Sequence, residues 1–380
     1  MSYQPNEEQR MAVDGLRKFL ADVIEPQAKE YGDNKIPKEL MQDWFKQLVP
    51  FGLITAPIAE ADGGLGLDWQ THLYLYEELA YSSVDIAVPL AINTFIANSL
   101  VTTASEELKQ RYLPGLLSGE LFGSGAISEP DVGSDVSAVK TRAVRDGDHW
   151  VINGEKTWIT NGHYSDFIIC TCKTGDFELS HILIDRKEHG YESRDIPKIA
   201  MNGQSTAQIF LDDVRVPVSN TLGNVGDGLK NTLKNFEIAR CHMATWGVGL
   251  ARRALEESVK YSRERTQHRK PIAGHQMIAE KLATMATKID AARLLTHRAA
   301  SLVDEDIRCD VECSMAKWYG TEIAVDAARD AVQIHGGNGL TKEFIVERLV
   351  REAIISPIPD GTTEIQKLLI SRYLTGISAF

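Results

Sequence analysis

The sequence predicts an α+β protein in which a β domain lies between two helical domains. Apolar residues recur at helical spacing in the first third, short β-branched and aromatic runs fill the middle, and long helical segments occupy the last third. We therefore expect an N-terminal helical domain at residues 1–121, an antiparallel β domain at 122–225 and a C-terminal four-helix-bundle domain at 226–380.

The first expected domain begins with an amphipathic helix. Between Glu8 and Ile24 the apolar residues fall on one helical face, and further helical stretches continue to about Leu113. Three glycines between Pro57 and Leu67 interrupt any helix there, so a loop is expected at this point.

The middle third reads as short strands. Two β-branched runs at 149–152 and 155–160 flank Asn153-Gly154, a dipeptide that suits a type I′ turn, so we predict a hairpin. Further strands are expected at 166–172, 177–185 and 207–216.

The last third returns to helical periodicity. Long helices are expected at 229–265, 276–303 and 311–335. A final helix should begin near Thr363, because Thr363 and Gln366 have the spacing of a capping box.

The overall charge argues against a nucleic-acid partner. The chain has 53 acidic and 41 basic residues, a formal charge of -12, whereas nucleic-acid binding depends on neutralising phosphates. No run approaches the length of a membrane span, and the acidic start resembles neither a signal nor a transit peptide, so a cytoplasmic location is expected. The five cysteines are expected to be reduced, and none has the histidine neighbours of a zinc site, so no metal is predicted.

Two stretches in the middle third carry a family resemblance. Ala126–Asp135 reads AISEPDVGSD, and Lys156–Gly162 reads KTWITNG about 20 residues later. They resemble the paired flavin-binding signatures of the acyl-CoA dehydrogenase family, and the resemblance extends over essentially the whole chain. It implies FAD as cofactor, an acyl-CoA substrate, an electron-transfer flavoprotein as acceptor and a homo-oligomer, expected to be a tetramer.

The same resemblance assigns roles to residues of the two stretches. Small residues and hydroxyls let backbone N–H groups approach a flavin and its phosphates closely. Trp158 would lie against the flavin ring, although a packed strand aromatic is the alternative, and Thr160 would donate a hydrogen bond to the reactive ring edge. Ser134 would also face the CoA ligand. The cofactor residues implied here are Ala126, Ile127, Ser128, Gly133, Ser134, Trp158, Ile159 and Thr160.

A second set of residues resembles the family segments that hold the adenine and pyrophosphate end of FAD, partly across a subunit boundary. The set comprises Arg265, Gln267, Gln276, Gln333, Gly336 and Gly337. The basic residues near Arg265 stand out in an acidic protein and suit an anion, although they also read as a solvated helix end. The family usually has Phe-Gly where this chain has His268-Arg269, so the contacts there differ.

The segment from Pro357 to Gln366 resembles the catalytic loop of the family. Most members have a glutamate before the Gly-Thr pair, which removes the C2 proton of the thioester while a hydride leaves C3 for flavin N5. This chain has Asp360 at that position, and a buried carboxylate within reach of the proton can serve as base. By the same resemblance Gly361 contacts substrate, and Thr362 and Glu364 contact the cofactor.

The shorter aspartate suggests a hypothesis about the substrate. Because Asp360 is one methylene shorter than glutamate, either the substrate C2 lies closer to the loop backbone or the pocket holds a bulkier, branched or alicyclic acyl group nearer the base, such as cyclohexanecarboxyl-CoA. Straight short chains stay open. The resemblance further implies an oxyanion hole made by the backbone N–H of Asp360 and a ribityl hydroxyl of FAD.

Some relatives carry the base on a helix instead, at the position of Ala239. Glu237 points about 200° away from that position on a helix, so Asp360 is the preferred base. The resemblance implies that Glu237 and Arg240 line the CoA channel, with an interhelical salt bridge as the alternative for Arg240.

Two other functions remain open at this point. A nitroalkane-oxidase-like flavoenzyme also uses an aspartate base and needs no CoA. A non-catalytic paralogue would bind FAD and acyl-CoA without turnover, and the shortened carboxylate motivates that alternative.

Overall fold

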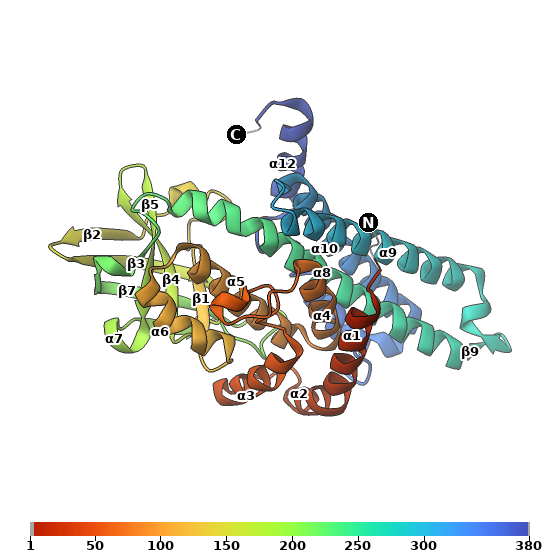
Figure 1. The fold of residues 1–380 in the computed structure, drawn as a ribbon. Coiled ribbons are helices and arrows are strands. Elements are labelled where there is room, and N and C mark those ends of the chain that lie inside the picture. The colour runs from red at the N-terminus through yellow and green to blue at the C-terminus, as the bar shows by residue number, and fades with distance from the viewer. Residues whose placement is uncertain (1–3, 379–380) are drawn as a thin grey trace. The chain divides into compact units, whose positions relative to one another are not determined.

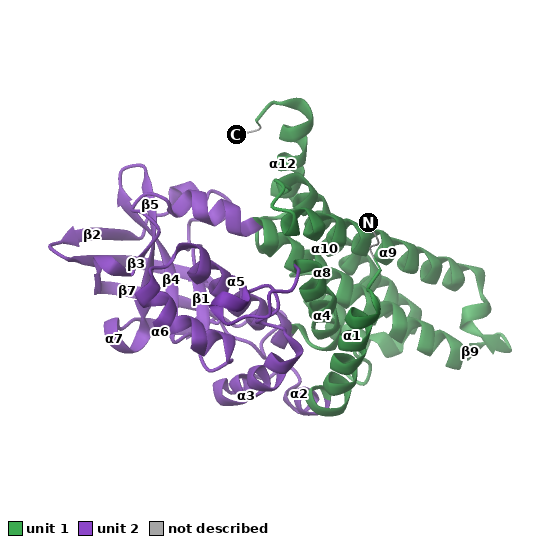
Figure 2. Ribbon diagram, viewed as in Figure 1, with its two compact units in different colours: residues 1–25, 69–84, 237–380 green, residues 26–68, 85–236 purple. Residues whose placement is uncertain are grey.

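A computed structural model describes residues 4–378 of the chain (Figure 1). The chain divides into two compact units (Figure 2). Unit 1 comprises residues 1–25, 69–84 and 237–380, and unit 2 comprises residues 26–68 and 85–236. Each unit thus combines segments that lie far apart in the sequence.

Unit 1 is helical, and its main helices begin and end close to the predicted positions. The amphipathic face of the first helix is confirmed, because Leu16, Leu20 and Ile24 are buried. Helix α11 was not predicted. The helices are α1 (Glu7–Phe19, continued by a π-helical turn, Leu20–Ile24), α4 (Trp69–Ser82), α8 (Gly228–Glu264, of which residues 228–236 belong to unit 2), α9 (Gln276–Asp304), α10 (Asp310–His335), α11 (Val346–Ala353) and α12 (Thr363–Thr375).

A buried ionic network joins four of these helices. Glu77 on α4 accepts hydrogen bonds from Arg252 on α8 and from Arg293 on α9, at 2.7–2.9 Å. Glu78 accepts from Arg252 and from Arg17 on α1. Both carboxylates are almost fully buried. Since each buried charge has an opposite partner, the network fixes how the helices of unit 1 pack.

Unit 2 contains an eight-stranded sheet in the part of the chain that the structure describes. The strand order is β6-β7-β3-β2-β4-β5-β8, with β1 beside β4. Most pairs are antiparallel, as predicted, but β1 and β2 each pair with β4 in parallel. The strands are β1 (Gly123–Ala126), β2 (Arg142–Asp146), β3 (His149–Thr160), β4 (Phe167–Gly175), β5 (Glu178–Asp185), β6 (Glu192–Asp195), β7 (Thr206–Pro217) and β8 (Thr221–Leu222).

Helices accompany this sheet within unit 2. They are α2 (Glu25–Tyr31), α3 (Lys38–Leu48), α5 (Val84–Thr103), α6 (Glu106–Leu117) and the short α7 (Arg186–His189). The glycine-containing segment before α4 is a loop, as expected. The helix-strand-helix order confirms the predicted α+β class.

The predicted hairpin at Asn153-Gly154 is wrong. Strand β3 continues through this dipeptide, because it pairs with β2 on one side and with β7 on the other. The dipeptide lies at a register shift in the β3–β7 pairing, where Asn153 exchanges hydrogen bonds with Asp213 at 2.9 Å. A Cβ atom on Gly154 would lie 2.5–2.8 Å from atoms of Thr141, so glycine serves a close strand approach here rather than a turn.

The expectation that no segment approaches a membrane span also needs correction. Helix α5 is long and apolar enough to cross a membrane, with a mean hydropathy of 1.6 over its most apolar window. However, 72% of that window is buried inside the protein, which is typical of a core helix.

The five cysteines agree with the sequence prediction. All are buried and none forms a disulfide. The sulfur atom of Cys313 lies 3.7 Å from that of Cys241 and 3.6 Å from that of Cys309, between α8 and the start of α10. The structure finds no metal-binding group of histidine, cysteine or carboxylate residues in the region that it describes.

Candidate active site

Asp360 lies in unit 1, in the loop between α11 and α12. Its φ angle is 53°, in the left-handed region that few non-glycine residues adopt, and Gly361 follows with φ 90°. Such a conformation costs free energy and is retained where the surroundings enforce it, often at functional sites.

The predicted capping box of Thr363 and Gln366 at the start of α12 is not formed. The N-cap is Thr362, whose hydroxyl accepts a hydrogen bond from the Ile365 N–H at 3.4 Å. The Thr363 hydroxyl instead donates to Glu322 on α10 at 2.6 Å. Gln366 is then free of a capping role and reaches back to the loop.

Two buried side chains tie the backbone of this loop. The Lys317 ammonium group on α10 donates a hydrogen bond to the Pro357 carbonyl at 2.6 Å. The Gln366 amide donates to the carbonyls of Gly361, at 2.9 Å, and Asp360, at 3.3 Å. Both side chains are completely buried. The loop is therefore held at both ends by contacts that leave the Asp360 side chain unused.

The carboxyl group of Asp360 makes no hydrogen bond or ion pair with any other described residue. Burial raises its pKa, whereas the positive charges of Lys317 and Arg240 act in the opposite direction. Desolvation also raises the pKa of Tyr76 on α4, and the charge of Asp360 adds to that effect. An unpartnered carboxyl group with a raised pKa has the properties of a general base.

Arg240 on α8 is, like Lys317, a buried cation whose charge acts on Asp360. It is 6% exposed, and its Nε atom has no hydrogen-bond partner. The salt bridge considered from the sequence is not found among the described residues, although the charges of Glu237 and Asp360 both favour the guanidinium cation. Ala239, at the alternative base position, is buried and carries no ionisable group.

The two flavin-type motifs meet in unit 2. The Thr157 N–H donates to the Ser128 carbonyl at 2.9 Å, so the end of β3 lies against the loop that follows β1. Within that loop Glu129 and Val132 exchange backbone hydrogen bonds, which makes a tight turn. Ala126 is buried inside the sheet, and Ile127 is partly buried.

A buried ion pair between Lys156 and Glu129 holds this loop in place. Lys156 on β3 is fully buried and donates to Glu129 at 2.9 Å and to the Ile127 carbonyl at 3.0 Å. Glu129 also accepts from the backbone N–H groups of Lys140 and Thr141, each at 2.8 Å. Although burial opposes ionisation, these hydrogen bonds and the Lys156 charge lower the pKa of Glu129.

Three other residues of the motifs, Gly133, Ser134 and Trp158, are exposed to solvent. Trp158 is 61% exposed and has φ 63°, so the packed strand aromatic considered from the sequence is not found. Gly133 and Ser134 are exposed, and a Cβ atom on Gly133 would meet nothing within 4 Å. Ile159 is buried and Thr160 is partly buried. An exposed indole beside an open loop offers a surface for a flat aromatic ligand.

A hollow of about 580 Å³ lies in unit 1 at the far ends of α8 and α10. Arg265, Gln267, Gly336 and Gly337 of the predicted adenine set line it. Gln276 and Gln333 are exposed and are not among its lining residues. Four of the six predicted residues are therefore brought together.

The hairpin beside this hollow is formed by β9 (Thr266–Gln267) and β10 (Lys270–Pro271). Its turn residues His268 and Arg269 have φ angles of 51° and 66°. Neither Arg265 nor Arg269 makes an ion pair with the residues described by the structure, so their guanidinium groups are available to an anion. His268 also lines the hollow.

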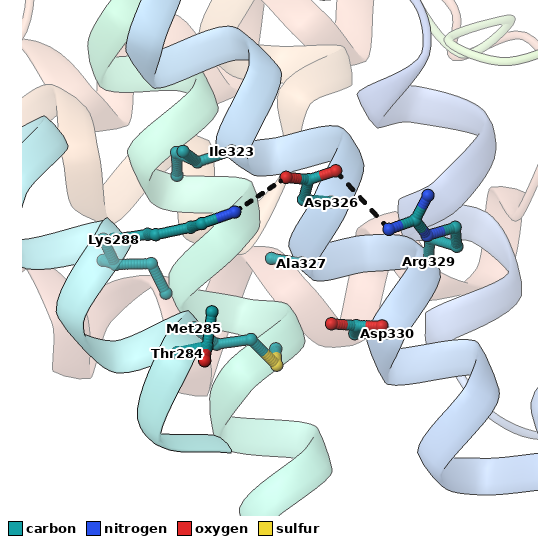
Figure 3. A pocket seen from close by; sticks show the side chains of 9 residues that line it. Thr284, Met285, Lys288, Ile323, Asp326, Ala327, Arg329 and Asp330 are labelled. Atoms are coloured by element: carbon teal, nitrogen blue, oxygen red, sulfur yellow. Dashed lines mark hydrogen bonds and ion pairs between the residues drawn. The ribbon is translucent and has the colours of Figure 1, made fainter. Parts of the chain in front are cut away.

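A smaller hollow between α9 and α10 has a different character (Figure 3). Lys288 and Arg329 both point toward Asp326, at 3.0 and 3.6 Å, and Lys281 pairs with Asp330. Because these charges satisfy one another, this place offers no chemistry beyond helix packing.

The residues present fit a flavin dinucleotide. Taken unit by unit, the exposed indole and open loop of unit 2 suit a ring system, and the unpaired Arg265 at the glycine-lined hollow of unit 1 suits a pyrophosphate.

The sequence analysis did not identify Lys317, Gln366 and Tyr76 as neighbours of Asp360. The only sequence signal for Lys317 was a lysine among the small and apolar residues on the buried face of α10.

Comparisons with known proteins agree with the geometry. The N-terminal, middle and C-terminal domain models of acyl-CoA dehydrogenase match residues 6–120, 124–214 and 226–375. An acyl-CoA dehydrogenase of Bacillus subtilis is 36% identical over 97% of both chains. Cyclohexane-1-carbonyl-CoA dehydrogenase of Syntrophus aciditrophicus and the CarC subunit of the caffeyl-CoA reductase-Etf complex of Acetobacterium woodii are each 35% identical over 96% of both chains.

Solved structures give the same result. The glutaryl-coenzyme A dehydrogenase–glutaryl-CoA complex has a TM-score of 0.94 and 33% identity, covering 99% of this chain and 97% of that one. A glutaryl-CoA dehydrogenase from Mycobacterium smegmatis in complex with FADH2 has a TM-score of 0.93 and 27% identity, covering 99% and 96%. The chain therefore belongs to the acyl-CoA dehydrogenase family, a family of FAD-dependent oxidoreductases, and has its fold.

Proposed function

We propose that the protein dehydrogenates an acyl-CoA thioester between C2 and C3, with Asp360 as the base. The observation that carries this proposal is the Asp360 carboxyl group, which is unpartnered among the described residues and lies near two buried cations. Its backbone is fixed by Gln366 while its side chain is left available, as proton transfer requires.

The chain's own residues perform the proton transfer in this proposal. The Asp360 carboxylate takes the C2 proton, and the Asp360 backbone N–H stabilises the negative charge that develops on the thioester oxygen. Arg240 and Glu237 line the CoA channel, and Gly361 lets the thioester approach the loop closely. Arg240 keeps a positive charge near the developing anion.

We propose FAD as the cofactor, and when bound it supplies the acceptor for the hydride that leaves C3. Its ring would lie on Trp158 and accept a hydrogen bond from Thr160, with Ser134 reaching toward the CoA ligand. The glycine-lined hollow near Arg265 would take the adenine and pyrophosphate end. Thr362 and Glu364 at the start of α12, and the exposed Gln276 and Gln333, are proposed as further contacts.

The proposed substrate class is a branched or alicyclic acyl-CoA. With the shorter base, either the substrate C2 lies closer to the loop or the pocket holds a bulkier, branched or cyclic acyl group nearer the carboxylate. The relative named cyclohexane-1-carbonyl-CoA dehydrogenase supports an alicyclic acyl group.

The proposed electron acceptor is an electron-transfer flavoprotein, which the relative from an Etf complex supports. We also propose a homotetramer and a cytoplasmic location. The exposed apolar side chains of Met277, Tyr373, Leu374 and Ile377 in unit 1 support an oligomer, since burying them would remove apolar surface from water. We further propose that the chain forms three domains, at residues 1–121, 122–225 and 226–380.

The test is anaerobic reduction of the purified flavoprotein, followed by bleaching at about 450 nm. The panel contains cyclohexanecarboxyl-CoA, 2-methylbutyryl-CoA, butyryl-CoA and nitroethane. Asp360→Asn, which keeps the shape of the side chain, should slow bleaching by a factor of about 10²–10⁴. Asp360→Glu should keep the base and shift the preference toward straight chains.

Each outcome selects one function. Bleaching by a thioester that Asp360→Asn slows by a factor of about 10²–10⁴ supports the dehydrogenase, and the fastest thioester identifies the acyl class. Bleaching by nitroethane alone would point to the nitroalkane oxidation considered from the sequence. Tight binding of thioesters without bleaching would instead identify a non-catalytic binding protein.

A further inference from the structure

Lys317 is a buried cation without an ion pair. Its side chain is 0% exposed, and its only hydrogen bond among the described residues is the 2.6 Å contact with the Pro357 carbonyl. No described carboxylate lies within ion-pair distance of its ammonium group. Burying a cation in this way costs several kcal/mol in general, so its presence beside the Asp360 loop points to a role beyond packing.

Two buried cations near the loop both act on the carboxyl group of Asp360. Lys317 and Arg240 both favour the ionised form of Asp360, and each in turn is favoured by the Asp360 charge. The groups that face Asp360 are Lys317 on α10, Arg240 on α8 and Tyr76 on α4, and those that also face Lys317 are Glu322 on α10, Glu364 on α12 and Arg240.

The protonation states follow from these neighbours. Burial lowers the pKa of Lys317 to about 8, despite the opposing charges of Asp360 and Glu322, so its ammonium group is charged at neutral pH. Burial raises the pKa of Asp360, and the two cations limit that rise. Removal of one cation should therefore make Asp360 harder to ionise.

We propose that Lys317 is a positioning residue for Asp360: it fixes the loop through the Pro357 carbonyl, and its positive charge favours the ionised form of the Asp360 carboxyl group. The inference rests on the proposed role of Asp360 as base. It adds to that role a reason why this carboxyl group is ready to accept a proton.

Three variants separate the effect of the Lys317 charge from the effect of its hydrogen bond to the loop. Lys317→Met removes both the charge and the hydrogen bond to Pro357, and it should fold because it replaces a buried cation with an apolar chain of similar length. Lys317→Gln removes the charge but keeps an N–H donor. Gln366→Leu is the matched control, since it removes the uncharged attachment of the same loop at Asp360 and Gly361.

The first measurement is the rate of anaerobic flavin bleaching by a saturating acyl-CoA as a function of pH. The acidic limb of this pH–rate profile is the pH range in which protonation of Asp360 lowers the rate. In Lys317→Met and Lys317→Gln it should move to higher pH by about one unit. In Gln366→Leu the rate should fall at all pH values while the limb stays in place. An unmoved limb in both Lys317 variants, or an equal shift in Gln366→Leu, would overturn the proposal.

A second measurement does not depend on turnover. The carboxylic-acid C=O stretch of Asp360 is assigned in the holoenzyme by its absence in Asp360→Asn and is titrated by infrared difference spectroscopy. Its midpoint should rise in Lys317→Met, and equal midpoints in wild type and variant would overturn the proposal. If Asp360→Asn bleached as fast as wild type, the base assignment would fail, while the infrared titration would still decide the role of Lys317.

Discussion

The carboxyl group of Asp360 and the guanidinium group of Arg240 attract each other without forming an ion pair. Burial raises the pKa of Asp360 and the charge of Arg240 opposes that rise, while the charge of Asp360 favours the cationic form of Arg240. Burial nevertheless lowers the pKa of Arg240, whose Nε atom has no hydrogen-bond partner. Arg240 is therefore held in a place that costs folding free energy.

Replacement of Arg240 by methionine should stabilise the protein and impair ligand binding. We expect Arg240→Met to increase the free energy of unfolding by about 1 kcal/mol, because a buried charge without an ion pair is replaced by an apolar chain. Thermal unfolding of the holoenzyme measures this effect. Calorimetric titration should show weaker acyl-CoA binding, and a less stable variant would mean that Arg240 has a stabilising partner after all.

The pair formed by Lys156 and Glu129 should be essential for the flavin-motif loop. Lys156→Met leaves the Glu129 carboxylate buried without its cation, which should cost about 3–5 kcal/mol of unfolding free energy and lower the bound FAD content. The ratio of flavin to protein absorbance measures the second effect. Adding Glu129→Gln to Lys156→Met should recover part of the stability, and no recovery would contradict the charge argument.

The pH dependence of this pair has a definite sign. The pKa of Glu129 is lower in the folded protein than in the unfolded chain, where a glutamate titrates at about 4.3. Its stabilising contribution is therefore fully present above that pH and is lost as the pH falls through the folded value. The stability difference between wild type and Lys156→Met should accordingly shrink in acid, and denaturant unfolding at several pH values would measure it.

Glu77 should contribute more than Glu129 to the loss of stability as the pH falls. Although burial opposes ionisation, the hydrogen bonds and charges of Arg293 and Arg252 lower its pKa to about 2. Its contribution is thus present above about pH 4.3, the unfolded value, and is lost as the pH falls toward 2. Glu77→Gln should destabilise unit 1 by about 3–5 kcal/mol at neutral pH, with a smaller loss in acid. A loss that did not vary with pH would refute the ionic explanation.

Gly154 offers a test of the corrected strand assignment. Gly154→Ala places a Cβ atom against the backbone of Thr141 and should cost about 2–3 kcal/mol. Gly147→Ala is the matched control, because Gly147 has φ 65° but open space around it, and should cost only about 1 kcal/mol. Equal losses measured by denaturant unfolding would mean that close strand approach is not the reason for glycine at 154.

The fold was predictable from the sequence because its long elements have strong periodicity. Helices α8, α9 and α10 begin and end within one or two residues of the predicted positions. Asn153-Gly154 was misread because a turn signal is local, whereas the pairing of β3 with both β2 and β7 depends on distant segments. Strand β1 escaped prediction because its sequence of glycine, serine and alanine has no β-type pattern.

The candidate site was only partly predictable for a related reason. Asp360, Arg240 and the flavin-type motifs were identified through resemblance to a family. Lys317 and Gln366 were not, because their importance lies in contacts with backbone carbonyls 40 and 5–6 residues away, which leave no pattern in the sequence. The exposure of Trp158 likewise depends on an unusual φ angle that the sequence does not encode visibly.

The left-handed backbone at Asp360 has an evolutionary consequence. Short side chains that bond locally tolerate this conformation better than glutamate does, so an exchange of glutamate for aspartate here relaxes the loop while it retracts the carboxylate. One mutation would then alter both the strain and the reach of the base. A lineage could pass from one acyl shape to another through that single codon, without first losing a folded enzyme.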